Sequence, residues 1–239
     1  MFREKNMLDS KTSIVLALAF SLVFSGTITG TVTFDGKAPK RKKLKMNADP
    51  VCGSSHEKPV LDEKLILNDK NQIKNVLVWV KGAKGGQPKS PAILDQSGCV
   101  YSPHVLGVMK GEDLLIKNSD ATLHNIHSMS KTNSSFNFAM PKVVKEKTVS
   151  FEKVEEPFAI KCDVHPWMKS WVSVFDHGFF AVTDENGNYS IEGVPEGEYE
   201  VVAWQERFKM KGAITQKVNV KNGKNNVNFT FKRPSKNKK

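Results

Sequence analysis

The alternation of apolar and polar residues with period two is what most constrains the fold of this 239-residue chain. Residues 27–34 alternate in this way and stop at the turn dipeptide Asp35-Gly36, and residues 75–80 form a run rich in β-branched side chains. From residue 101 onward strands and turns recur at short intervals, and no segment has a convincing helical period. The pattern predicts an all-β protein built from sandwiches.

Three side chains in one short loop indicate which kind of metal site the chain could form. Cysteine, histidine and methionine follow one another with the spacing Cys-x2-His-x2-Met, as Cys162, His165 and Met168, and Pro166 stiffens the loop by fixing its φ. With one distant histidine, these donors complete the ligand set of a type 1 copper site, which has two imidazoles, a thiolate and a weak axial thioether. His124 is the best candidate for that histidine. Structural zinc usually collects four N or S ligands and avoids thioether, so copper fits better.

The N-terminus has the pattern of an export signal. Basic residues precede the apolar run 13–24, and the small residues Ser25 and Gly26 follow it. Cleavage after Ser25 makes residues 1–25 a signal peptide and predicts a periplasmic or secreted protein. The apolar run is shorter than the roughly 20 residues of a spanning helix. An uncleaved segment would instead attach the chain to a membrane.

Net charge points to the kind of partner. The chain carries a formal charge of +11, and its lysines are spread along the sequence. A basic surface suits nucleic acid, an anionic membrane or an acidic protein. The sequence has no helix-turn-helix, zinc-finger or RNA-binding motif, so we expect an acidic protein and no nucleic acid. The basic tail 233–239 lacks hydrophobic periodicity, which predicts disorder.

Export also bears on the state of the other two cysteines. An oxidising compartment favours disulfides, and if Cys162 binds metal, Cys52 and Cys99 are left as a disulfide pair. A second metal site made by Cys52, Cys99 and His104 is the alternative.

Residues 101–176 resemble the cupredoxin family. The stretch opens with an aromatic-x-Pro triplet, continues through a Gly-Glu-Asp turn at residue 111, and has Asn-Ser-Asp before His124. Cupredoxins begin in a similar order. The pair His124-Asn125 and the short loop after Cys162 are most similar to those of amicyanin and pseudoazurin.

This resemblance implies a Greek-key β-sandwich over residues 97–177 that holds one mononuclear type 1 copper. The implied ligands are His124, Cys162, His165 and Met168. It also implies that Asn125 hydrogen-bonds across to the cysteine loop, because such outer partners hold ligand segments in register.

The resemblance further implies how electrons leave the site. In cupredoxins the counterpart of His165 is the ligand at the solvent edge through which electrons pass. Pro166 and Trp167 would then form part of an apolar docking rim. His127 matches a histidine that is not a ligand in amicyanin, so we do not expect it to contact metal.

The flanking segments resemble a second family. Residues 182–204 contain a Thr-Asp-x-x-Gly-x-Tyr hairpin and a Pro-x-Gly-x-Tyr turn. Both are similar to the carboxypeptidase regulatory-like domain, a small transthyretin-like β-sandwich. We predict that residues 26–90, with a long loop over 37–64, form this sandwich together with residues 178–232, and that the copper domain is inserted between them. Exported proteins of this two-part kind are often labelled methylamine-utilisation proteins.

These features predict an exported blue-copper protein that carries single electrons, and not an enzyme. Four protein ligands leave no open coordination position, and there is no Ser-His-Asp set or paired-carboxylate signature. An acidic cytochrome or dehydrogenase is the expected partner. Two alternatives remain open: a copper storage or delivery protein without redox cycling, and a secreted sandwich that binds carbohydrate or cell envelope. Trp79 and Trp204 are candidate carbohydrate contacts, although their strand positions favour the core.

Overall fold

The computed structural model describes residues 24–233, which are almost entirely strand, turn and loop. The predicted all-β class is therefore confirmed. Almost all of the expected signal peptide (1–25) and of the basic tail (233–239) lies outside the described residues. Within residues 24–233, no helix has the length and apolar character needed to cross a membrane.

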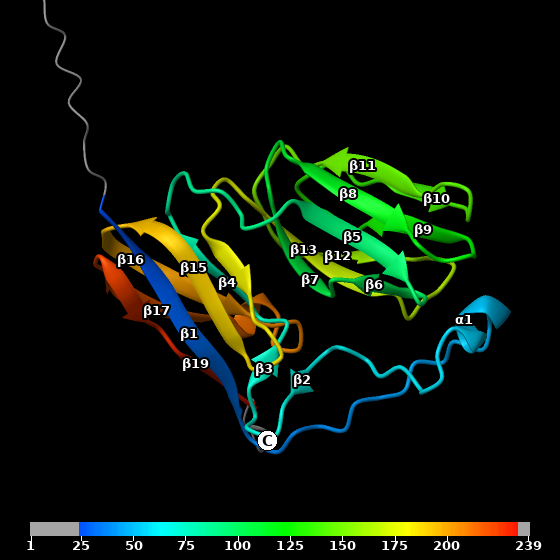
Figure 1. Ribbon diagram of the computed structural model, residues 1–239, viewed down its shortest axis with the longest axis horizontal. Helices are drawn as coiled ribbons and strands as arrows, with labels where there is room; N and C mark the ends of the chain where they lie inside the picture. Colours follow the sequence, from blue (N-terminus) through cyan, green and yellow to red (C-terminus); the bar gives the residue numbers. More distant parts are fainter. Residues whose placement is uncertain (1–23, 234–239) are drawn as a thin grey trace, which may run out of the picture.

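Two groups of strands lie side by side (Figure 1). We call the first the split sandwich, because its strands come from both ends of the described chain. One sheet has β1 (Ser25–Asp35) between β15 (Asn188–Pro195) and β18 (Gly223–Asn226), with β19 (Phe229–Lys232) also pairing with β1. The other has the order β14 (Phe180–Val182), β4 (Leu77–Lys81), β16 (Gly197–Trp204) and β17 (Ile214–Val220). A small ribbon pairs β2 (Ile66–Leu67) with β3 (Ile73–Lys74).

The second group, the central sandwich, uses only the strands β5 to β13. Its five-stranded sheet has the order β10 (Asn137–Met140), β9 (His124–Ser128), β12 (Glu155–Lys161), β13 (Lys169–Phe175) and β7 (Val105–Met109). Its four-stranded sheet has the order β11 (Glu146–Ser150), β8 (Asp113–Asn118), β5 (Ala92–Ser97) and β6 (Val100–Ser102). Because β5 pairs with β8, this sandwich begins at Ala92, earlier than the expected boundary at 97.

Period-two patterning explains both cores. In β1 the side chains of Ile28, Val32 and Phe34 are buried, while the threonines between them are partly exposed. These residues join the apolar core of the split sandwich, and a separate cluster that includes Leu94 and Ile160 fills the central sandwich. Each sandwich therefore buries its own apolar faces.

A third apolar cluster joins the two sandwiches. It buries Leu77 and Trp204 of the split sandwich against Val105 and Phe175 of the central one. Trp79 packs against it, with its ring centroid 5.8 Å from that of Phe175. Both tryptophans considered as carbohydrate contacts thus pack between the sandwiches.

The long segment between β1 and β2 was expected to be a loop, and it also contains a short helix. This helix, α1 (Pro50–Ser54), lies at the end of the central sandwich, far from β1 (Figure 1). The Cys52–Cys99 disulfide, with an S–S distance of 2.06 Å, ties α1 to the turn between β5 and β6. The other helical turn within residues 24–233 is η1 (Met210–Gly212).

Candidate metal centre

Three buried donor residues converge at one end of the central sandwich. His124 begins β9, Cys162 directly follows β12, and His165 lies on the loop that leads to β13. Strands β9 and β12 are antiparallel neighbours, so the start of β9 and the end of β12 lie at the same end of the sheet. The donor atoms of the three residues lie within 4.8 Å of one another. The structure thus places the donor atoms of three of the four predicted ligands close to one another.

The fourth, Met168, lies beside them on the same loop. Its side chain is 1% exposed and belongs to the same buried cluster as Cys162. The Met168 N–H donates to the His165 carbonyl at 2.9 Å, and the Met168 carbonyl accepts from the Cys162 N–H at 3.3 Å. These two bonds close the loop into a compact turn, which keeps the donors close to one another.

The Cys162 sulfur lies in surroundings that favour a thiolate. Backbone N–H groups of Asn125 and His165 donate to Sγ at 3.5 and 3.4 Å. Burial alone would raise the pKa of the Cys162 thiol, but hydrogen bonds from His124 and from these N–H groups bring that pKa below its ordinary value. The thiolate is the form that binds metal.

Each histidine uses both of its ring nitrogens. The two Nδ1 atoms lie 2.9 Å apart inside the cluster, and His165 Nδ1 is 3.8 Å from Cys162 Sγ. On the outer side, His124 Nε2 is 2.8 Å from an Asp120 oxygen and His165 Nε2 is 3.0 Å from an Asp49 oxygen. An outer carboxylate that holds the Nε2 proton leaves Nδ1 free as a metal ligand.

The carboxylates also set the charge of the cluster. Burial alone would lower the pKa of His124, but hydrogen bonds to Asp120 and Cys162 raise it to about 9. Burial works against ionisation of Asp120 and Asp49 as well, yet the bonds to His124 and His165 and to backbone N–H groups lower both carboxyl pKa values. The His124 imidazole therefore lies between two partners that favour its protonated form, the Asp120 carboxylate and the Cys162 sulfur.

Sequence reasoning missed both carboxylates. Asp120 had a signal, because it lies four residues before His124 in the Asn-Ser-Asp motif. Asp49 had none, since 116 residues separate it from His165.

Asn125 bridges the two ligand segments. Its side-chain oxygen accepts from the Asp163 N–H at 2.6 Å, and its amide donates to Asn137 Oδ1 at 2.6 Å. His127 lies on the opposite face of β9 from His124. Its Nδ1 is 3.0 Å from an Asp163 carboxylate oxygen. It takes no part in the donor cluster.

The expectation that His165 forms the solvent edge is wrong. His165 is 2% exposed because Asp49 and α1 cover its outer side, with Cys52 Sγ 3.7 Å from Nε2. Pro166 is exposed and Trp167 is half-buried. The Trp167 ring centroid lies 5.0 Å from that of His165, and its Nε1 donates to the Cys99 carbonyl at 2.9 Å.

The alternative second metal site does not form either. Cys52 and Cys99 are bonded to each other, so neither offers a thiolate. His104 lies elsewhere, with Nε2 2.7 Å from Glu206 and Nδ1 3.6 Å from Glu63. Since its two ring nitrogens face different carboxylates, His104 belongs to an ionic cluster between the sandwiches.

Solved structures similar to parts of this chain include amicyanin variants, a purple cupredoxin and a copper-containing nitrite reductase. An oxidised amicyanin variant matches over 41% of this chain and 98% of its own, with 17% identity and a TM-score of 0.32. A purple cupredoxin from Nitrosopumilus maritimus matches over 35% of this chain and 99% of its own, with 24% identity and a TM-score of 0.30. A copper-containing nitrite reductase from Thermus scotoductus matches over 39% of this chain and 24% of its own, with 23% identity and a TM-score of 0.30.

A family model described as polysaccharide lyase family 4, domain II, matches residues 160–227. This match begins near the end of β12 and ends just after β18. No curated protein matches the chain. The likeness of the flanking segments to a regulatory-like domain stays a prediction.

Proposed function

We propose that this chain is an exported type 1 copper protein that carries single electrons between redox partners in the periplasm or outside the cell. The observation that carries the proposal is the convergence of His124, Cys162 and His165 in a buried cluster. A thiolate with two imidazoles is a donor set that suits copper, and Met168 would add the weak axial thioether. Bound copper would supply a one-electron couple.

The surrounding residues support such a role. Asp120 and Asp49 orient the two imidazoles, and Asn125 holds the two ligand segments in register. Burial of all three donors keeps water away from the centre. Four protein ligands would leave no open position for a substrate, which favours a carrier over an enzyme.

The partner we propose is an acidic redox protein, such as a cytochrome or a dehydrogenase. The charge of +11 would steer it toward an acidic surface, and added salt would weaken that attraction. Within this proposal, the central sandwich is the copper domain, inserted into a regulatory-like module formed by the split sandwich.

The test is the visible spectrum after loading with Cu(II). We expect an intense thiolate-to-copper band in the parent protein and in His127→Ala, whose histidine lies outside the donor cluster, and none in Cys162→Ser. A colourless protein that retains only Cu(I) would replace the carrier with copper storage or delivery. A protein that binds no copper would overturn both, and would leave a β-sandwich that binds carbohydrate or cell envelope.

A further inference from the structure

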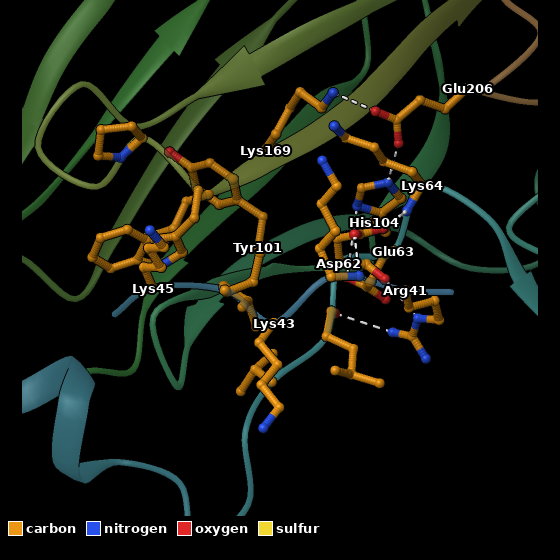
Figure 2. A pocket seen from close by; sticks show the side chains of 18 of the residues that line it. Arg41, Lys43, Lys45, Asp62, Glu63, Lys64, Tyr101, His104, Lys169 and Glu206 are labelled. Atoms are coloured by element: carbon orange, nitrogen blue, oxygen red, sulfur yellow. Dashed lines mark hydrogen bonds and ion pairs between the residues drawn. The ribbon is translucent and has the colours of Figure 1, made fainter. Parts of the chain in front are cut away.

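A basic groove of about 740 Å³ adjoins the metal-ligand loop (Figure 2). One wall is the part of the long segment that precedes and follows α1, at residues 41–45 and 60–64. The other wall includes Lys161 of β12, residues 166–168 of the ligand loop and Lys169, the first residue of β13. The groove therefore runs between these parts of the long segment and the loop that carries Cys162 and His165 of the donor cluster.

The basic wall is an ordered part of the fold. The backbone of Lys43 pairs with that of Leu61, and the Leu44 N–H donates to the Val60 carbonyl at 2.8 Å. Arg41 adds a side-chain bond to the Leu61 carbonyl at 3.0 Å. Leu44 packs against the central core, and Lys43 and Lys45 on either side of it are exposed and line the groove.

The positive charge of the groove is largely uncompensated. Seven lysines and arginines line it against three carboxylates. Glu206 is already held by His104 and Lys169, and Figure 2 shows this group at the opposite end of the groove from Lys43. Within residues 24–233, Lys43, Lys45 and Lys161 form no ion pair. Three ammonium groups are thus free to meet an external anion.

The groove also approaches the donor cluster from a side other than that of His165, whose outer side is covered. His165 is covered by Asp49 and Cys52, whereas the half-buried Trp167 and the side of Met168 line the groove. The Trp167 ring centroid lies 5.0 Å from that of His165. A molecule seated in the groove would contact the ligand loop directly.

We propose that this basic groove is the docking surface for the acidic face of an electron-transfer protein, which approaches the centre at Trp167 and Met168 and not at His165. The inference rests on the proposed function, whose site it completes with a partner surface. Lysines without an ion-pair partner that line the same groove as a half-buried tryptophan are suited to this task. The charges speed and orient the encounter, and the aromatic ring supplies the buried contact.

The first test compares two triple charge reversals in the copper-loaded protein. The groove variant is Lys43→Glu/Lys45→Glu/Lys161→Glu. The control is Lys84→Glu/Lys221→Glu/Lys224→Glu, which makes the same change in net charge at exposed lysines outside the groove. The visible copper band of both variants must match the parent, which shows that the centre is intact.

The measured quantity is the rate of copper reduction by the anionic reagent hexacyanoferrate(II), over a range of ionic strength. The groove variant should react about tenfold or more slowly at low salt and lose most of the salt dependence, because local charge rather than net charge steers the encounter. The control should stay within about threefold of the parent. Equal slowing of both variants would overturn the proposal.

The second test needs no metal. Poly-L-glutamate is added to the metal-free protein, and backbone amide shifts are followed by NMR. We expect shifts at residues 41–45 and 161–169 in the parent and in the control, and their loss in the groove variant. Shifts spread over all surface lysines would contradict a specific surface. A groove-dependent rate without groove shifts would mean a small-anion site, and would also overturn docking of a protein.

The two proposals fail separately. If poly-L-glutamate binds the groove but no blue band forms, the copper carrier is wrong while the acidic-protein surface stands. If the blue band forms but both triple variants behave alike, the carrier stands and the groove inference is wrong.

Discussion

At the scale of single residues, the orientation of the two imidazoles is the feature on which the proposed copper binding would depend. His124 and His165 point Nδ1 into the cluster because a carboxylate on the outer side holds each Nε2. The Asp120 oxygens also accept from the backbone N–H groups of Gly98 and Cys99 at 2.7 and 2.8 Å. The orienting carboxylate is therefore fixed by the turn between β5 and β6.

We predict that Asp120→Asn weakens copper binding about 10- to 100-fold, because the amide no longer offers a charged acceptor to His124 Nε2. Competition with a copper chelator would measure the affinity. Asp113→Asn, at an exposed aspartate of β8, is the control and should bind like the parent. An unchanged affinity in Asp120→Asn would show that His124 is oriented by packing alone.

At the scale of elements, α1 is a cover held in place by a side-chain cap at its N-terminus and by a disulfide at its middle residue, Cys52. Asp49 Oδ1 caps the helix by accepting from the N–H groups of Val51 and Cys52 at 2.7 and 3.2 Å, while Oδ2 faces His165. A five-residue helix is not stable by itself. The cap and the Cys52–Cys99 disulfide therefore supply the order of this segment.

Cys52→Ser/Cys99→Ser should lower the free energy of unfolding by about 4 kcal/mol on the chain-entropy model for a loop of this length. We also expect a chelator to extract copper faster, because α1 would no longer be tied over His165. Denaturant unfolding and stopped-flow extraction are the measurements. Parent protein whose disulfide has been reduced, with the reductant removed before copper is loaded, should reproduce both effects. Extraction at the parent rate would show that α1 stays in place without the bond.

At the scale of the whole molecule, an apolar cluster and an ionic cluster fix the two sandwiches against each other. Glu206, which follows β16 of the split sandwich, bonds to His104 and Lys169 of the central one. Burial alone would raise the pKa of Glu206, but these two partners lower it to about 2. The carboxylate is therefore ionised in the folded protein across most of the acid range.

The sign of the pH effect follows from that shift. A carboxyl whose pKa falls from 4.5 to about 2 on folding adds stability above its unfolded pKa and loses it as the pH falls toward 2. Glu206→Gln should therefore cost about 3 kcal/mol at neutral pH, and the difference from the parent should shrink below the unfolded pKa. Denaturant unfolding over this pH range would measure it. The exposed Glu156→Gln should change little at any pH.

The predictable part of the site is local in the chain. Cys162, His165 and Met168 share one short loop, so their proximity follows from backbone geometry. His124 could be chosen because it follows a recognisable motif. Asp49 could not be chosen, since its segment has no period that would say where it packs.

The sequence by itself determined the all-β class and the position of the donor loop, because period-two patterning and short spacing act over a few residues. Only the tertiary structure decided that His165 is covered, that Trp204 is buried between the sandwiches, and that Lys43 lines the same groove as the ligand loop. Each of these depends on contacts between distant segments. Such contacts are settled by packing of the whole chain, and local patterns do not encode them.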